Sequence, residues 1–419
     1  MSGSRRILGQ GLVLGTVVLL HFGQLVKGTE DLTRNVSSTF NEGCNIPFCK
    51  NSNNGSFVNV FHISARGQND TIHFVWSSYG ALTGLVAQTK NTAVFRIDWE
   101  KVKNRSLNAI SFEPKGAVLF SSGVIFSRLI EFDDVSDTAK LTPASKIKVK
   151  SFEDLQWNNF NMTVSKTKHS GVFNSSSLAK GGNGFISLMV QGFQDNGRGK
   201  VLPQLLHTSN SSYFEFALKN ISTHFNNSRF ALELVFVHQD KKNKTSFSIS
   251  RSIADQYTPA VFYVDNVKFT PSSKDNLGGY VSWKPVTYTK EERHLGNGKL
   301  VHQYGLKTNV TQLWDHLPLY SIAHAFWGDL KDLDITSMNI SFGIDQDGFY
   351  KETNYTVWCG LVGYGEAPLD GLSLLIIIVI SASIGIPVVL IVFGGSFMSF
   401  RNLLRKKKGE ALLVDPGIN

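Results

Sequence analysis

The stretch LSLLIIIVISASIGIPVVLIVF, residues Leu372 to Phe393, decides how this chain is organised, because its 22 residues carry no charge. As a helix it would extend for roughly 33 Å, enough to cross a hydrocarbon core of about 30 Å. The basic run RKKK follows it at 405–408. Since Lys and Arg collect on the cytoplasmic side of membrane helices, the pattern predicts one transmembrane helix at 372–393 and a cytosolic tail at 394–419.

The other end of the chain complements this helix. Arg5 and Arg6 precede the apolar stretch Ile7–Leu20, and small residues follow it as far as Gly28. This layout is typical of a cleaved secretory signal, which we place at 1–28. An uncleaved anchor remains the alternative. A signal at the start and one span near the end predict a type I membrane protein with its N-terminal domain in a lumen.

The basic residues are concentrated at the two ends of the chain. The signal and the tail each contribute +3 to the formal net charge of +9, which leaves +3 for residues 29–371. A nucleic-acid-binding protein gathers its cations on one folded face instead. The sequence therefore predicts no nucleic-acid partner, and we interpret the run at 405–408 as a stop-transfer cluster at the lipid bilayer.

Acceptor sequences for N-linked glycans, N-x-S/T, recur throughout the predicted luminal region. Because a glycan is bulky and hydrophilic, each modified asparagine must lie at the surface. So dense a coat would cover the loops that proteases cut, although a role in solubility and folding alone is the simpler alternative. The thirteen acceptors are Asn35, Asn54, Asn69, Asn104, Asn161, Asn174, Asn210, Asn220, Asn226, Asn243, Asn309, Asn339 and Asn354.

Three cysteines agree with an oxidising lumen. Cys44 and Cys49 could close a short loop as a disulfide, which would leave Cys359 over. Pairing of either one with Cys359 stays open at this point.

The luminal region predicts an all-β fold. Short segments rich in aromatic and β-branched residues, such as RFALELVFVH at 229–238, alternate with turn signals such as Asn297-Gly298. The length suggests one or two β-sandwich-like modules. We place the boundary in the glycine-rich stretch 192–201, which gives modules at 29–195 and 196–371.

The search for chemistry finds no catalytic motif. The sequence contains no HExxH, no G-x-S-x-G and no phosphate-binding loop, and we therefore expect no enzyme, no cofactor and no metal. The membrane helix offers a packing feature instead. Ser381 and Gly385 have the small-xxx-small spacing that lets another helix approach closely.

Four segments carry a family resemblance: NDTIHFVWSSYG at 69–80, FSSGVIFSRLIEFDD at 120–134, DHLPLYSIAHAFWGDL at 315–330 and NYTVWCGLVGYGEAP at 354–368. They resemble the vertebrate glycosylated lysosomal membrane protein family. The resemblance implies a heavily glycosylated type I protein of the lysosomal membrane without enzymatic activity. It also implies an accessory subunit that protects a multi-span lysosomal major facilitator superfamily transporter for dipeptides from proteolysis.

The resemblance implies a tyrosine-based sorting signal in the tail, and this tail departs from that pattern because it has no tyrosine. Leu412 and Leu413 offer a dileucine as the possible sorting signal, and sorting together with the partner is the alternative. Two other functions remain as alternatives. A membrane-anchored luminal hydrolase requires carboxylates that converge in a cleft, and a ligand-binding receptor requires an exposed aromatic platform.

Overall fold

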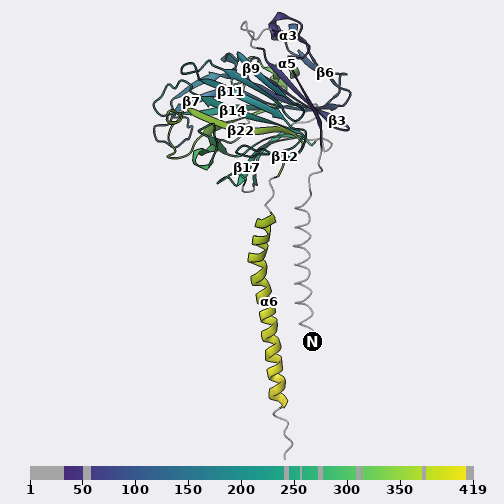
Figure 1. Ribbon diagram of the computed structural model, residues 1–419, viewed down its shortest axis with the longest axis vertical. Helices are drawn as coiled ribbons and strands as arrows, with labels where there is room; N and C mark the ends of the chain where they lie inside the picture. The colour runs from purple at the N-terminus through teal and green to yellow at the C-terminus, as the bar shows by residue number, and fades with distance from the viewer. Residues whose placement is uncertain are drawn as a thin grey trace, which may run out of the picture.

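The computed structural model describes residues 33–50, 58–239, 245–254, 257–271, 277–307, 313–314, 316–369 and 374–411. The predicted signal at 1–28 lies outside these residues. Among them the chain folds into antiparallel strands that form a β-sandwich, and one long helix extends away from it (Figure 1). The predicted fold class, an all-β domain with a single C-terminal helix, is confirmed.

The first layer runs in the order β1-β2-β3-β4-β7-β15-β21-β20, and β8 also pairs with β7. Its strands are β1 (Asn35–Phe40), β2 (Val60–Arg66), β3 (Asp70–Ser77), β4 (Thr83–Lys90), β7 (Val118–Asp133), β8 (Ile147–Ser151), β15 (Ser228–His238), β20 (Gly298–Gln303) and β21 (Asp334–Phe342).

The second layer runs in the order β9-β10-β11-β14-β22-β18-β17-β16. A short strand, β19, pairs with both β22 and β20 and so joins the two layers along one side. The strands are β9 (Asn159–Val164), β10 (His169–Ser175), β11 (Phe185–Gly192), β14 (Ser211–Lys219), β16 (Ser246–Ile253), β17 (Tyr263–Thr270), β18 (Gly279–Trp283), β19 (Val286–Tyr288) and β22 (Tyr355–Tyr364).

Smaller elements cover the outside of the sandwich. Two hairpins pair β5 (Val94–Ile97) with β6 (Ile110–Glu113) and β12 (Gly197–Arg198) with β13 (Leu206–His207). The helices are α2 (Pro47–Lys50), α3 (Trp99–Lys103), α5 (Ile322–Trp327), α6 (Leu374–Ala411) and the 3-10 turns η2 (Phe152–Asp154), η3 (Leu295–Asn297), η4 (Leu330–Asp332) and η5 (Tyr350–Glu352).

The core follows from the two-residue period of the strands. On β22, Trp358 and Val362 point between the layers, whereas Val357, Cys359 and Leu361 point outward. The outward set is also buried, since the chain around β12 and β13 folds over it. On the first layer, the β5–β6 hairpin, α3 and α5 cover the outer face in the same way. Central strands therefore carry buried side chains on both faces.

Strands from both predicted modules alternate in the sheets. β7 pairs with β15, and β11 pairs with β14, so the predicted boundary at 195/196 is crossed in each layer. The core between the layers likewise contains Phe126 from one side of the boundary and Phe216 from the other. One sandwich therefore spans 29–195 and 196–371 where the structure describes them.

Helix α6 contains the predicted membrane segment. Residues Ile377–Arg405 are long and apolar enough to cross a bilayer, and the most apolar 18 residues among them have a mean hydropathy of 2.7 and are not buried by the protein. The helix continues beyond Phe393 to Ala411, so the first part of the predicted tail is helical. Pro387 lies inside the helix.

Candidate functional site

Ten of the thirteen glycan acceptors lie in the described residues, on strands and loops of the sandwich. Asn35, Asn69, Asn104, Asn161 and Asn226 are exposed, and four others are partly exposed. Those four are Asn174, Asn210, Asn220 and Asn354. Acceptors Asn54, Asn243 and Asn309 lie outside the described residues. Nine acceptors thus have the exposure that a glycan needs, and their use remains a prediction.

One acceptor differs from the others. Asn339 is 8% exposed on β21, where it pairs with the fully buried Glu233 of β15. Its backbone carbonyl accepts a hydrogen bond from the amide of Tyr304 at 3.0 Å. A glycan on Asn339 would therefore require the neighbouring chain to move aside. The N-x-S/T motif alone does not reveal that this asparagine is buried.

The structure joins Cys44 to Cys49 in a disulfide, with 5.9 Å between their Cα atoms. The side-chain amide of Asn41 fixes the loop, because it donates to the carbonyls of Cys49 at 2.9 Å and Val58 at 2.8 Å. The third cysteine, Cys359, is buried and free. The predicted short loop is therefore present, and the pairing with Cys359 that the sequence left open is not formed.

Replacing Cys44 with serine should lower the free energy of unfolding by about 2 kcal/mol, since the disulfide closes only a short loop of the unfolded chain. Thermal unfolding of the detergent-solubilised chain measures this change. Reductant should shift the unmodified protein toward the variant and leave the variant unchanged. Equal stability of the two proteins under oxidising conditions would contradict the prediction.

Cys359 belongs to a charged cluster that sequence reasoning missed. Arg293 binds Glu215 at 2.5 Å between Nη2 and Oε2, and its Nη1 lies 3.3 Å from the Cys359 sulfur. Tyr213 donates to the same Glu215 carboxylate at 3.0 Å. Burial, followed by the charge of Glu215, raises the pKa of Cys359 to about 12, so the thiol stays protonated. The thiol is thus a poor nucleophile.

On α6, the pair Ser381 and Gly385 lies one turn apart and so shares a face of the helix. A Cβ atom added at Gly385 would meet no atom within 4 Å. No described part of this chain covers the small-residue face beside Gly385, so a helix of another protein could pack there. Its use as a packing surface stays a prediction. The possible sorting residues Leu412 and Leu413 lie outside the described residues.

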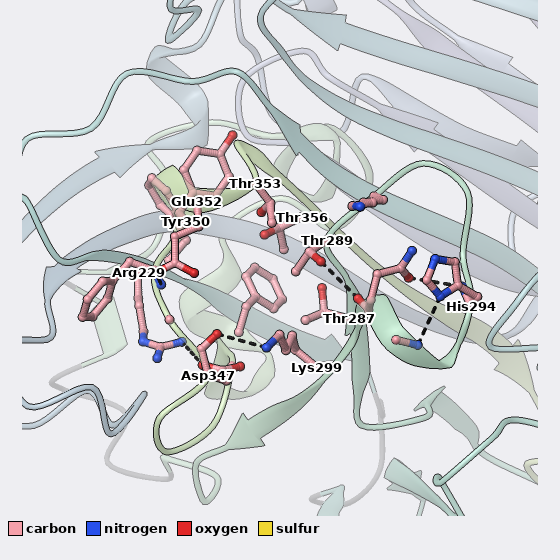
Figure 2. A pocket seen from close by; sticks show the side chains of 18 residues that line it. Arg229, Thr287, Thr289, His294, Lys299, Asp347, Tyr350, Glu352, Thr353 and Thr356 are labelled. Carbon is pink, nitrogen blue, oxygen red and sulfur yellow. Dashed lines mark hydrogen bonds and ion pairs between the residues drawn. The ribbon is translucent and has the colours of Figure 1, made fainter.

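A pocket of about 260 Å³ opens beside Arg229 (Figure 2). Figure 2 shows Arg229 and Lys299 on either side of Asp347, with Tyr350 and Glu352 on one wall and Thr287 and Thr289 on another. These residues come from β15, β19, the start of β20 and the segment before β22, so the pocket lies where the two layers are joined.

The carboxylates of this pocket are already engaged. Asp347 binds the Arg229 guanidinium at 2.6 Å, and Glu352 accepts from the backbone amide of Phe349 at 3.1 Å. The hydroxyls of Thr287 and Thr289 donate to backbone carbonyls at 2.7 and 3.2 Å. The pocket thus offers satisfied polar walls, whereas a glycosidase needs two free carboxylates facing a bond between them.

Arg229 itself is a structural cation. Its side chain is 4% exposed and contacts Asp134 at 2.6 Å, Asp347 at 2.6 Å and Asp137. Burial disfavours the charged guanidinium, but the aspartates, Asp347 foremost, outweigh it and raise the pKa of Arg229. Three carboxylates and one buried arginine tie the loop after β7 and the segment before β22 to β15.

A second buried ion cluster lies on the outer face of the first layer. Glu233 is 0% exposed and contacts Arg128 at 2.5 Å, His316 at 3.1 Å and Lys307 at 3.4 Å. Burial favours the neutral acid, but the hydrogen bond and charge of Arg128 prevail and lower the pKa of Glu233. The carboxylate thus holds the segments that contain Lys307 and His316 against the sheet.

A series of hydrogen-bonded side chains begins at Glu42, just before the disulfide loop that starts at Cys44. The Glu42 carboxylate lies 3.1 Å from His62 Nδ1, His62 Nε2 lies 2.9 Å from His73 Nδ1, and His73 Nε2 lies 3.0 Å from the Thr89 hydroxyl. Burial, followed by the charge of His62, lowers the pKa of His73 to about 3. The Glu42 pKa is also lowered, chiefly by its hydrogen bond to His62.

These clusters contain the groups that chemistry would use, and each group is bound to a neighbour. Among the described residues, no group of three or more His, Cys, Asp or Glu side chains is placed to hold a metal ion. Within the described residues, the arrangement stabilises a sandwich that presents glycan acceptors and is followed by one apolar helix.

Comparison with known proteins gives a consistent set of relatives. A family model described as glycosylated lysosomal membrane protein matches residues 59–405. The chain is 30% identical over 388 residues to glycosylated lysosomal membrane protein B of Xenopus laevis, covering 90% of this chain and 92% of the relative. It is 31% identical over 367 residues to the glycosylated lysosomal membrane protein of Danio rerio, covering 86% and 87%. The Homo sapiens protein of that name is 30% identical over 364 residues, covering 84% and 86%.

Proposed function

The chain belongs to the glycosylated lysosomal membrane protein family, and from this membership we propose that it is a non-enzymatic accessory subunit of a multi-span lysosomal transporter. The partner would be a major facilitator superfamily transporter of dipeptides. In this proposal the sandwich lies in the lumen, α6 crosses the bilayer once, and the tail faces the cytosol. The luminal body shields the partner from lysosomal proteases.

The observation that carries the proposal comes from the described residues, where nine exposed or partly exposed glycan acceptors lie on one sandwich that is followed by a single apolar helix. One helix cannot enclose a path for a solute, so the chain needs a companion if it takes part in transport. Glycans on the luminal body would cover the loops of both proteins against cleavage. The polar groups of the pocket beside Arg229 are bonded internally, which favours a shielding role over hydrolysis.

Deletion of this chain should lower the abundance of the transporter in lysosomes severalfold and leave its mRNA unchanged. Quantitative immunoblotting of purified lysosomes measures the loss, and a protease inhibitor should restore the transporter. Unchanged abundance of the transporter after deletion would refute the proposed function. A glycosidase that removes N-linked sugars should also increase the gel mobility of the mature chain, which tests the luminal orientation separately.

A further inference from the structure

The sheet edges of the sandwich are protected unequally. Within the described part of the chain, β1, β8, β9 and β16 each pair with a single neighbouring strand. A free edge exposes unpaired backbone amides and carbonyls, and proteins usually protect such edges with charge, bulk or cover. Here β1 carries the acceptor Asn35, β9 carries Asn161, and β8 carries Lys148 and Lys150.

Strand β16 carries neither a glycan acceptor nor a lysine. Its sequence, SFSISRSI, places Ser246, Ser248, Ser250 and Ser252 on one face, and these small side chains leave the backbone accessible. Its one charged residue, Arg251, is bound to the buried Asp265 of β17 through two hydrogen bonds, at 2.6 and 3.0 Å. The strand is therefore an edge without lysine, and its one charge is paired within the sheet.

The strands around β16 also lack glycan acceptors. The sequence has no N-x-S/T between Asn243 and Asn309, which is the longest such interval between neighbouring acceptors in the chain. This interval contains β16, β17, β18, β19 and β20. The nearest acceptor, Asn243, precedes the first residue of β16, and neither β16 nor the strands that follow it up to β20 carry one.

An apolar platform lies at the end of the open edge. Ile253, Tyr257 and Phe262 are 69%, 52% and 54% exposed. Two hydrogen bonds hold the described residues beside these side chains: the Ala254 amide donates to the Phe262 carbonyl at 2.7 Å, and the Thr258 hydroxyl donates to the Pro203 carbonyl. Large exposed apolar side chains that are grouped on one part of a surface are typical of an interaction site.

Cations accompany the aromatic side chains of this platform. The guanidinium of Arg198 lies 3.9 Å from the ring centre of Tyr257, and that of Arg251 lies 3.9 Å from the ring centre of Tyr263. Lys268 is exposed on the neighbouring strand. Aromatic residues with arginine are enriched in the centres of protein interfaces, and the positive charges of Arg198 and Lys268 favour an acidic partner.

We propose that the edge of β16, together with the platform of Ile253, Tyr257 and Phe262, binds an extended acidic segment on the luminal side of the transporter. The segment adds to the sheet as a further strand, with backbone hydrogen bonds along β16 and apolar side chains on the platform. This inference rests on the proposed function and specifies the surface through which it is performed.

The test adds a glycan to the edge. Ser248→Asn creates an acceptor sequence with Ser250, and position 248 is exposed. Val149→Asn creates one with Ser151 on β8, which is an exposed edge strand of the other layer and serves as the matched control. Each full-length variant is co-expressed with an epitope-tagged lysosomal dipeptide transporter and captured in mild detergent through the tag. A glycosidase-sensitive gel shift establishes that each new site is occupied.

With the glycan at position 248, capture with the transporter should fall at least tenfold, whereas the Val149→Asn variant should be captured as well as the unmodified chain. Equal capture of both variants would refute the proposed binding surface and leave the proposed function intact. Failure of the unmodified chain to be captured would instead refute the proposed function. Loss of binding between two differently tagged copies of this chain, with transporter capture unchanged, would assign the edge to self-association and overturn the proposal.

A second pair of variants needs no glycan and tests the platform without altering the strand. Phe262→Ser removes an exposed apolar side chain, and Leu319→Ser removes one that is 88% exposed elsewhere on the surface. Capture should fall at least fivefold for Phe262→Ser alone. Equal capture of the two serine variants would exclude the platform. Normal glycan maturation of each variant identifies those that have folded.

Discussion

Replacing Arg229 with methionine is expected to lower the free energy of unfolding by roughly 3–5 kcal/mol, because it leaves three carboxylates without their shared cation in a buried site. Arg229 is 4% exposed, and Asp134 and Asp347 are buried with it. Since methionine keeps much of the side-chain volume, the loss reports the uncompensated charge rather than a cavity. Thermal unfolding of the detergent-solubilised chain at neutral pH measures it.

The matched control is Arg96→Met. The Arg96 side chain is 60% exposed and its partner Glu113 is 62% exposed, with 3.1 Å between their charged atoms. A surface ion pair of this kind contributes about 0–1 kcal/mol. Similar losses for the two variants would show that Arg229 does not hold the aspartates of the two loops in the way that its contacts indicate.

The second large effect is a loss of stability in acid. The pKa of His73 is about 3 in the folded protein, against about 6.5 when the chain is unfolded, so the unfolded state binds the proton more readily. This contribution to stability is complete above pH 6.5 and is lost as the pH falls toward 3. Between pH 7 and pH 5 the loss amounts to about 2 kcal/mol. His324 and His207, each with a pKa of about 4, act in the same direction.

His73→Gln should remove most of the His73 share of this pH dependence, because glutamine does not titrate. Glu42, whose pKa is lowered, loses its contribution only below its usual value near 4.5 and so does not affect the window from pH 5 to pH 7. The control is Thr89→Val, which breaks the hydrogen bond to His73 but keeps the imidazole, so that stability falls equally at both pH values. An unchanged pH slope in His73→Gln would exclude this assignment.

Local patterns predicted the parts of the molecule that depend on local sequence. A long uncharged run of apolar residues predicts a membrane helix from local sequence alone, and α6 contains the stretch at 372–393 from Leu374 onward. Alternation and turn residues predicted strands, since side-chain direction in a strand has a period of two. The close spacing of Cys44 and Cys49 made their disulfide a clear candidate.

The pairing of strands that are far apart in the chain has no comparable signal in the local sequence. β7 and β15 are neighbours in the sheet although about 100 residues separate them, so length alone suggested a second module that the shared core does not contain. The ion clusters were missed for the same reason. Arg229 and Asp347 look like surface residues in the sequence, and only the fold brings them together in a buried site. Asn339 carried the same motif as the exposed acceptors and gave no sign of its burial.

The central strand β22 ends at Tyr364, and the membrane helix α6 begins at Leu374. Nine intervening residues, 365–373, extend at most about 30 Å, since each residue of a fully extended chain spans about 3.3–3.6 Å. This linker limits how far the sandwich can lie from the start of the apolar helix. A protein that contacts both the sandwich and the helix must therefore bring its two contact surfaces within that distance of each other.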